Sequence, residues 1–427
     1  MAAEGVAELA AAAGAPLCVL ARRLVTCDEA RASASSPLGV LEDAGLVVAA
    51  GRVVELGPRA AIEGALGTRY PAARRLDATD VVVTPGLCDA HTHAAWLGSR
   101  GHEYALRMAG AGYEAIAAAG GGIAATMRAV RGASRAEIAA SLRARLGRMA
   151  ALGVTTVEVK SGYGLDPPSE RKLLEAIADV AGASDLPAVV PTYLGLHAVP
   201  PEARADRPAY VRAATEALDG LAADGLCRYV DAYIDRNAFT TAEAEPLFRR
   251  ARALGLGVRA HVGQFADVGG AELAAAVKAA SVDHVEQLGE RGAAALGAAG
   301  VRAVLLPVAS FTLAQSPPPV ALLRAAGVPL VVASDANPGT APTESLPLAL
   351  ALAVRSYGLS VAEALGGVTR EAARSLGLPA GVLAPGAPAD LVVWDLPHED
   401  DLVAPWGVAR VRLVVRAGRV LHAAPAA

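Results

Sequence analysis

Histidine residues gather at the ends of the apolar segments that the sequence pattern predicts to be strands. Five of the eight histidines lie in or just beyond such a segment: His91, His93, His197, His261 and His284. Residues two apart on a strand point to the same side, so His91 and His93 can bind one cation together. Neutral imidazole is a good ligand for zinc, iron and similar metal ions, and a catalytic site keeps one coordination position open for water. The pair therefore predicts a catalytic metal centre.

Two further residues, His261 and Asp335, are candidates to complete that centre. A His-x-His pair by itself is more often structural, and Asp335 alone suits a turn or a helix cap equally well. Their positions in the strand series favour the metal, because His261 ends the fifth predicted strand, His284 lies in the sixth and Asp335 follows the eighth. In a parallel barrel the carboxyl ends of all strands meet at one mouth, where barrel enzymes have their active sites. We therefore expect these side chains to converge.

The middle of the chain alternates between apolar runs of strand length and Ala-rich segments of helix length. The runs are 81–87, 154–159, 188–195, 228–234, 258–262, 281–285, 302–308 and 330–334, and the helical segments include 169–182, 241–255, 271–280 and 343–358. Near-continuous apolar strands are typical of a parallel sheet covered by helices. About eight of them favour an α/β fold with a closed, TIM-like (β/α)₈ barrel. A doubly wound open sheet is the alternative, but no glycine-rich nucleotide-binding motif follows the first run.

The two ends of the chain resemble each other and differ from the middle. Strand-rich segments occur at 17–27, 46–56, 389–395 and 411–423, and the second contains a hairpin at Ala50-Gly51. Neither end has enough strands to bury a face alone. We expect residues 1–80 and 376–427 to form one small composite β domain, with the barrel at 81–375.

The composition excludes several classes of protein. A chain of 427 residues, 53% of them hydrophobic, can bury a large core. A net charge of -4 without a basic run argues against a nucleic-acid partner, and interrupted apolar stretches argue against a membrane partner. The four cysteines have no Cys-x-x-Cys spacing, so neither disulfides nor a thiolate zinc site is expected. The N-terminal segment lacks the basic leader of a secretion signal, and we expect a cytoplasmic protein.

The segment from 94 to 153 is longer than an ordinary connection in a barrel. It contains Arg100, Tyr113 and three consecutive glycines at 120–122. Such an insertion at a barrel mouth is typical of a segment that covers substrate. The glycines suit a helix start or a bend, because no lysine follows them as in a phosphate-binding loop.

Several longer motifs point to a family. They are PGLCDAHTH (85–93), KSGYGL (160–165), LHAVPPE (196–202), HVGQFADVGG (261–270) and SDANPGTAPTES (334–345). With these motifs the chain resembles the imidazolonepropionases, a family of the amidohydrolase superfamily, over nearly its whole length. The resemblance implies hydrolysis of the cyclic amide of 4-imidazolone-5-propanoate to N-formimino-L-glutamate, the third step of histidine degradation.

The same resemblance implies roles for the candidate residues. It implies one zinc or iron ion, divalent or trivalent, held by His91, His93, His261 and Asp335. Asp335 would accept a proton from the attacking water and deliver it to the leaving nitrogen, and His284 would stabilise the developing oxyanion. Gln264 stands where some members have Glu, and because an amide cannot exchange a proton we expect it to hydrogen-bond the substrate.

A carboxylate on the substrate is the feature that its binding residues are expected to recognise. Arg100 suits that carboxylate, because a guanidinium binds it through two parallel hydrogen bonds. The other substrate-binding candidates implied by the resemblance are Tyr113, Tyr163, His197, Gln264, Asn337, Gly339 and Thr340. Spacing alone would give an arginine or a tyrosine in these places an ordinary surface or packing role.

Lys160 stands near the end of the second predicted strand, where binuclear relatives have a carbamylated lysine that bridges a second metal. We expect one metal and an ion pair of Lys160 with Glu158 or another acid.

Two alternative functions remain open. The chain could be an amidohydrolase for another cyclic amide or a nucleobase, or a barrel that has lost its metal and acts through assembly. A homodimer is implied by the resemblance.

Overall fold

In the middle of the chain, strands alternate with helices, and eight parallel strands form a barrel. The computed structural model describes residues 15–110, 121–404 and 406–425. The barrel strands are β5 (Leu87–Asp89), β6 (Val154–Lys160), β7 (Ala188–Leu196), β8 (Tyr229–Ile234), β9 (Gly257–Val262), β10 (Ser281–His284), β11 (Arg302–Leu305) and β12 (Leu330–Val332), each bonded to the next in this order. Beyond the first and last strands, Thr92 and Ala336 form a parallel bridge. The predicted barrel is confirmed, and this bridge lies at its mouth.

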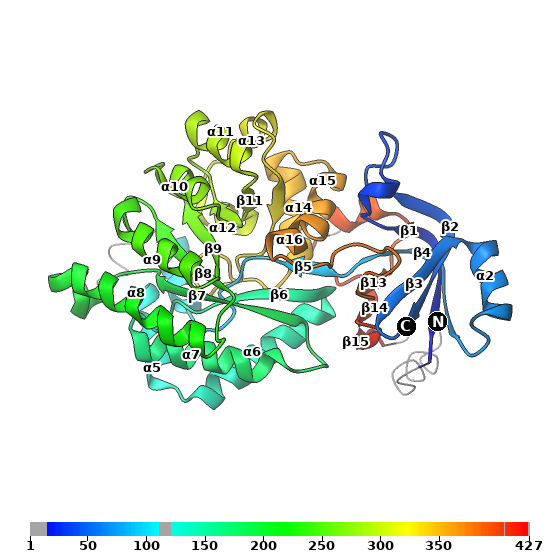
Figure 1. Cartoon of the computed structure of the whole chain (residues 1–427), viewed down its shortest axis with the longest axis horizontal. Coiled ribbons are helices and arrows are strands. Elements are labelled where there is room, and N and C mark those ends of the chain that lie inside the picture. The colour runs from blue at the N-terminus through cyan, green and yellow to red at the C-terminus, as the bar shows by residue number, and fades with distance from the viewer. Residues whose placement is uncertain (1–14, 111–120, 405, 426–427) are drawn as a thin grey trace.

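Helices cover the outside of the barrel (Figure 1). The helices described in this part of the chain are α3 (Gly101–Met108), α5 (Ile123–Gly132), α6 (Arg135–Ala151), α7 (Pro167–Ala181), α8 (Arg207–Ala223), α9 (Thr241–Ala253), α10 (Gly270–Ala276), α11 (Glu290–Ala299), α12 (Pro307–Leu313), α13 (Val320–Ala325), α14 (Leu346–Tyr357), α15 (Val361–Gly367) and α16 (Arg370–Ser375). Short 3₁₀ turns lie at Glu29–Arg31, Pro201–Asp206 and Glu399–Val403. Three of the helices begin with a capping box, in which Ser134, Thr240 or Ser360 pairs with the glutamate three residues later. Among the described residues, no helix combines the length and the apolarity needed to cross a bilayer.

Strands from both ends of the chain form a second sheet, drawn in blue and red beside the barrel in Figure 1. Its strands are β1 (Leu17–Val25), β2 (Val40–Ala49), β3 (Arg52–Pro58), β4 (Arg74–Pro85), β13 (Leu391–Trp394), β14 (Val411–Arg416) and β15 (Arg419–Ala423), in the order β15-β14-β13-β4-β1-β2-β3. The helix α2 (Arg59–Thr68) packs against β2 and β3. We call this unit the terminal sheet. It confirms the prediction of one sheet built from both ends.

Two hairpins of the terminal sheet turn through the same dipeptide. Ala50 and Gly51 join β2 to β3, Ala417 and Gly418 join β14 to β15, and all four residues have positive φ. Two such residues in a row are typical of the type I′ turn that suits the twist of a hairpin. The turns also touch, since a Cβ on Gly418 would lie 3.3 Å from Cα of Gly51. The hairpin predicted at Ala50-Gly51 is confirmed.

The predicted bounds of two strands differ from those in the structure. The run 81–87 is divided, because Val82 and Val83 pair with β1 in the terminal sheet and only Leu87 enters the barrel. Gly86 makes this passage possible, since a Cβ there would lie 2.2 Å from Oγ1 of Thr155. The run 302–308 ends early because Pro307 begins a helix. The terminal sheet therefore extends past residue 80, and the proposed domain limits stay a prediction.

Candidate metal centre and active site

Five buried side chains meet at the carboxyl ends of the barrel strands. His91 and His93 follow β5, His261 lies on β9, His284 ends β10 and Asp335 follows β12. Each of these side chains belongs to a residue that is at most 3% exposed. Nε2 of His93 lies 3.3 Å from Nε2 of His261 and 3.5 Å from Oδ1 of Asp335, which is itself 3.4 Å from Nε2 of His91. The donor atoms form two overlapping groups, each within 4.8 Å: His91 with His93 and Asp335, and His91 with His261 and His284. The structure therefore places the four predicted ligands and His284 beside one another, with His91 shared between the two groups.

The spacing of these donor atoms fits a bound cation. Donors placed 2.0–2.1 Å from a tetrahedral zinc ion are separated by about 3.4 Å from one another. Three of the separations among these donor atoms, at 3.3 to 3.5 Å, match that value. Nε2 of His91 and Oδ1 of Asp335 are also buried without a hydrogen-bond partner within the protein. Because buried polar atoms are normally satisfied, this pair of unpartnered atoms fits a site for a metal ion.

The protonation of the ligands also suits metal binding. Burial, with Lys160 and neighbouring histidines adding to it, lowers the pKa of His91, His93 and His261 well below the ordinary value. Their rings are therefore neutral at pH 7 and can donate a lone pair. Burial also raises the pKa of Asp335 to about 7.

Two aspartates orient the histidine ligands from behind. Nδ1 of His91 donates to Asp283 over 2.6 Å, and Nδ1 of His261 donates to Asp231 over 3.1 Å. A carboxylate on Nδ1 leaves the lone pair of Nε2 directed at the opposite side of the ring. Both rings therefore present Nε2 to the cluster.

Lys160 lies beneath the histidines and neutralises the buried acids. Its Nζ is 2.9 Å from Glu158, 2.8 Å from Asp231 and 3.6 Å from Asp283. Burial alone would lower the pKa of this lysine, but the three carboxylates outweigh burial and raise it. The predicted ion pair with Glu158 is confirmed, and the ammonium group remains protonated.

His284 differs from the three predicted ligand histidines in the shift of its pKa. Its Nδ1 lies 3.7 Å from Glu286, whose other oxygen accepts a hydrogen bond of 2.7 Å from Ser310. Burial opposes protonation of His284, but Glu286 and the more distant Asp335 and Asp283 outweigh burial and raise the pKa of the ring. The pKa of His284 is thus shifted in the opposite direction from those of the three predicted ligand histidines.

The backbone is strained at two of these residues. Asp335 has φ 55° and His284 has φ 83°, in the region that non-glycine residues seldom adopt. Strain of this kind is typical of functional sites, where the surrounding structure holds it in place.

Several predicted substrate residues form one wall beside the cluster. The ring of His197 stacks on His93 with centroids 5.0 Å apart, and Tyr163 lies 5.5 Å from His197 and 5.9 Å from His93. Tyr163 is buried. Oε1 of Gln264 accepts a 2.6 Å hydrogen bond from the hydroxyl of Tyr233, a residue of β8 that also faces His261.

Arg100 lies against the loop that follows Asp335. A side chain at position 339 would collide with Arg100, because its Cβ would lie 2.3 Å from Nη1, so Gly339 makes room for the guanidinium. Oδ1 of Asn337 accepts the backbone N–H groups of Gly339 and Thr340 over 2.8 and 2.7 Å. Asn337 thus shapes its own loop, and its contact with substrate stays a prediction. Tyr113 and Gly120 lie outside the described residues.

Asp231, Asp283, Glu286 and Tyr233 were not predicted from the sequence. A usable signal existed for the two aspartates, because a carboxylate inside an apolar barrel strand is rarely buried without a partner.

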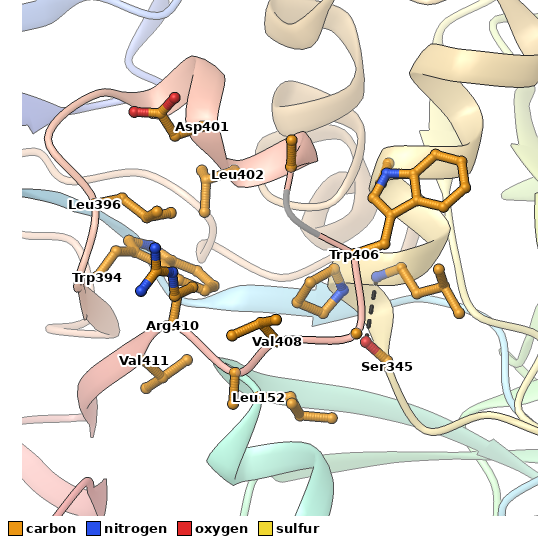
Figure 2. Close-up of a pocket in the computed structure, with 16 residues that line it drawn as sticks. Leu152, Ser345, Trp394, Leu396, Asp401, Leu402, Trp406, Val408, Arg410 and Val411 are labelled. Atoms are coloured by element: carbon orange, nitrogen blue, oxygen red, sulfur yellow. Dashed lines mark hydrogen bonds between the residues drawn. The ribbon is translucent and has the colours of Figure 1, made fainter.

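Figure 2 shows a separate pocket beside α14, lined by residues that include Trp394, Trp406 and Val408. Its volume is about 220 Å³. Its lining contains none of the predicted site residues.

Comparisons with known proteins show which family the chain resembles. The family model described as "Amidohydrolase family" matches residues 114–422. An imidazolonepropionase of Polaromonas sp. is 44% identical over 389 residues, 90% of each chain, and one of Caulobacter vibrioides is 45% identical over 370 residues, 86% of this chain and 91% of that protein.

Solved structures share the fold at lower sequence identity. A triazine hydrolase variant has a TM-score of 0.73 at 18% identity, covering 96% of this chain and 95% of its own. An adenosine deaminase from Xanthomonas campestris with bound zinc has a TM-score of 0.67 at 21% identity, covering 95% and 92%.

Proposed function

The chain belongs to the imidazolonepropionases of the amidohydrolase family, and we propose that the five-residue cluster at its barrel mouth performs their reaction. The chain hydrolyses the cyclic amide of 4-imidazolone-5-propanoate to N-formimino-L-glutamate, in histidine degradation. The observation that carries the proposed site is the set of 3.3 to 3.5 Å separations among buried donor atoms. We assign one zinc or iron ion to His91, His93, His261 and Asp335.

A metal ion held by these side chains would lower the pKa of a coordinated water and polarise the ring carbonyl. Asp335 takes the proton of the attacking water. The water oxygen bonds to the carbonyl carbon, the bond from that carbon to the ring nitrogen breaks, and Asp335 returns the proton to the nitrogen. His284, whose pKa is raised by Glu286 against the effect of burial, donates to the carbonyl oxygen as negative charge develops there.

The walls of the site hold the substrate for this step. Arg100 binds the propanoate carboxylate through its guanidinium, which lies against Gly339. Tyr163 and His197 pack against and hydrogen-bond the ring, because both lie beside His93. Gln264 adds an amide hydrogen bond. We also retain Tyr113, Asn337 and Thr340 as substrate contacts, and a homodimer acting in the cytoplasm as the form of the enzyme.

Metal analysis and a substrate assay test this proposal together. Purified protein is expected to contain about one zinc or iron ion per chain, and imidazolone propanoate should lose its ultraviolet absorbance in its presence. A chelator should slow that loss, and adding metal back should restore it. Full activity in metal-free protein would overturn the site. Turnover of a nucleobase that is indifferent to Arg100→Ala would favour an aminohydrolase instead.

A further inference from the structure

One buried carboxylate holds the loop that carries Tyr163. Glu170, in the first turn of α7, is 1% exposed. One of its oxygens accepts the N–H of Gly162 over 2.6 Å, and the other accepts the N–H groups of Gly164 and Leu165 over 2.7 and 2.8 Å. Burial raises the pKa of Glu170, and the hydrogen bonds from the turn oppose that rise because they stabilise the charged form. The turn at 161–165 is thus built around this side chain.

The shape of the turn requires such an acceptor. Gly162 has φ 100° and Leu165 has φ 54°, so the chain reverses here and directs successive N–H groups inward. Buried N–H groups need a partner, and the carboxylate supplies it. The turn is also tightly packed, because a Cβ on Gly164 would lie 2.5 Å from the backbone nitrogen of Glu170. Loss of the carboxylate would therefore change the path of the turn.

The turn controls two residues of the substrate wall. Tyr163 is its central residue, and the carbonyl of Gly162 accepts a 2.7 Å hydrogen bond from Nδ1 of His197. That bond leaves Nε2 of His197 as the ring nitrogen available to substrate. The metal ligands come from β5, β9 and the segment after β12, and not from this turn.

We propose that Glu170 is a positioning residue for substrate binding, acting through the 161–165 turn on Tyr163 and His197. The inference rests on the proposed function only where those two residues are taken to touch the substrate. Glu170 should therefore act differently from the metal ligands. Loosening the turn should weaken the affinity for substrate more than the affinity for metal.

Glu170→Gln tests this directly. The amide keeps the volume of the carboxyl but turns an NH₂ group toward backbone donors. We expect KM to rise about tenfold while kcat changes by less than about threefold, with the metal content unchanged. Glu175→Gln on the same helix is the matched control, because Glu175 pairs with surface arginines. An unchanged KM for Glu170→Gln would overturn the proposal.

Two further measurements separate positioning from general stability. Hydrogen exchange of a peptide covering 160–166 should be slow in the wild type, faster in Glu170→Gln and unchanged in Glu175→Gln. In a Tyr163→Phe background, Glu170→Gln should raise KM much less than in the wild type, because the two changes act on one contact. Fully additive effects would contradict action through Tyr163.

Two further results test the proposal if Glu170→Gln does not fold or if the wild-type protein has another activity than the one proposed. Glu170→Asp keeps the charge but shortens the side chain, so a smaller rise in KM is expected, and a wild-type KM would count against the proposal. Wild-type protein that does not consume imidazolone propanoate would refute the proposed function. The exchange of the 160–166 peptide would then still decide whether Glu170 holds the turn.

Discussion

The terminal sheet and the mouth of the barrel are both buried, but they are built from opposite kinds of side chain. The core of the sheet contains fully buried aliphatic residues that include Val19, Leu24, Leu46, Val83 and Leu413. The layer under the barrel mouth contains fully buried charges: Glu158, Lys160, Asp231, Arg259 and Asp283. Burying apolar surface stabilises a fold, whereas each buried charge costs desolvation that only its partners offset.

This difference indicates that the buried charges under the barrel mouth lower stability but support the function of the site. The carboxylates of the barrel layer orient histidines and surround Lys160, so their contacts serve the candidate metal centre. In the terminal sheet, by contrast, the pair of Arg412 with Asp80 lies near the solvent. Changes at the mouth should therefore alter activity and metal binding, while changes in the sheet should alter stability alone.

The largest effect is expected from Asp335→Asn at the barrel mouth. The amide can neither take the proton of the water nor supply a charged metal ligand, so kcat/KM should fall by a factor of about 1,000 or more. Steady-state kinetics and metal analysis measure the change, and Asp179→Asn on α7 is the control at an exposed ion pair. A variant with a tenth of the wild-type activity would show that Asp335 is not the proton carrier.

Lys160→Met should be the next largest change. It leaves Asp231 without its ammonium partner and Asp283 with Arg259 as its remaining cation, which should lower the free energy of unfolding by about 3–5 kcal/mol. Because those aspartates orient His91 and His261, metal affinity should weaken by about 10- to 100-fold. Urea unfolding and metal titration measure the two effects, with the exposed Lys278→Met as control. Unchanged metal affinity would show that the layer is structural only.

Leu46→Ala tests the opposite side of the comparison. Leu46 is fully buried in the terminal sheet, so the cavity left by the substitution should cost about 2–4 kcal/mol of unfolding free energy. The kcat/KM of the folded variant should match that of the wild type. Val54→Ala, at a position 39% exposed, is the control in the same sheet and should change stability little. A loss of activity in folded Leu46→Ala would show that the sheet shapes the active site.

The smallest effect is expected from a charge on the outside of the barrel. Hydrogen bonds from Arg207, together with those of the Thr240 capping box, lower the pKa of Glu243 to about 2. Since the folded-state pKa is depressed, the stabilisation is present above the unfolded pKa of about 4.5 and is lost as the pH falls toward 2. Solvent screening keeps it below about 1 kcal/mol. The difference in unfolding free energy between wild type and Glu243→Gln should therefore vanish in acid, and a constant difference would exclude this charge effect.

Local pattern was sufficient for most of the barrel. Apolar runs such as 188–195 and 258–262 coincide with β7 and β9, because a buried parallel strand needs no polar face. The run 81–87 shows the limit, because both of its parts are equally apolar. Only the pairing partners, β1 and β13 for one part and β6 for the other, assign them to different sheets.

The types and spacings of His91, His93, His261 and Asp335 were sufficient by themselves to predict a metal centre at a barrel mouth, because strand periodicity and strand ends fix where such side chains point. Only the tertiary structure revealed that Asp283 and Asp231 lie behind two of those histidines and that Lys160 joins them. The same holds for Glu170 under the turn of Tyr163. These contacts depend on the register and closure of the barrel, which bring together buried polar groups that must satisfy one another, and no local spacing contains that information.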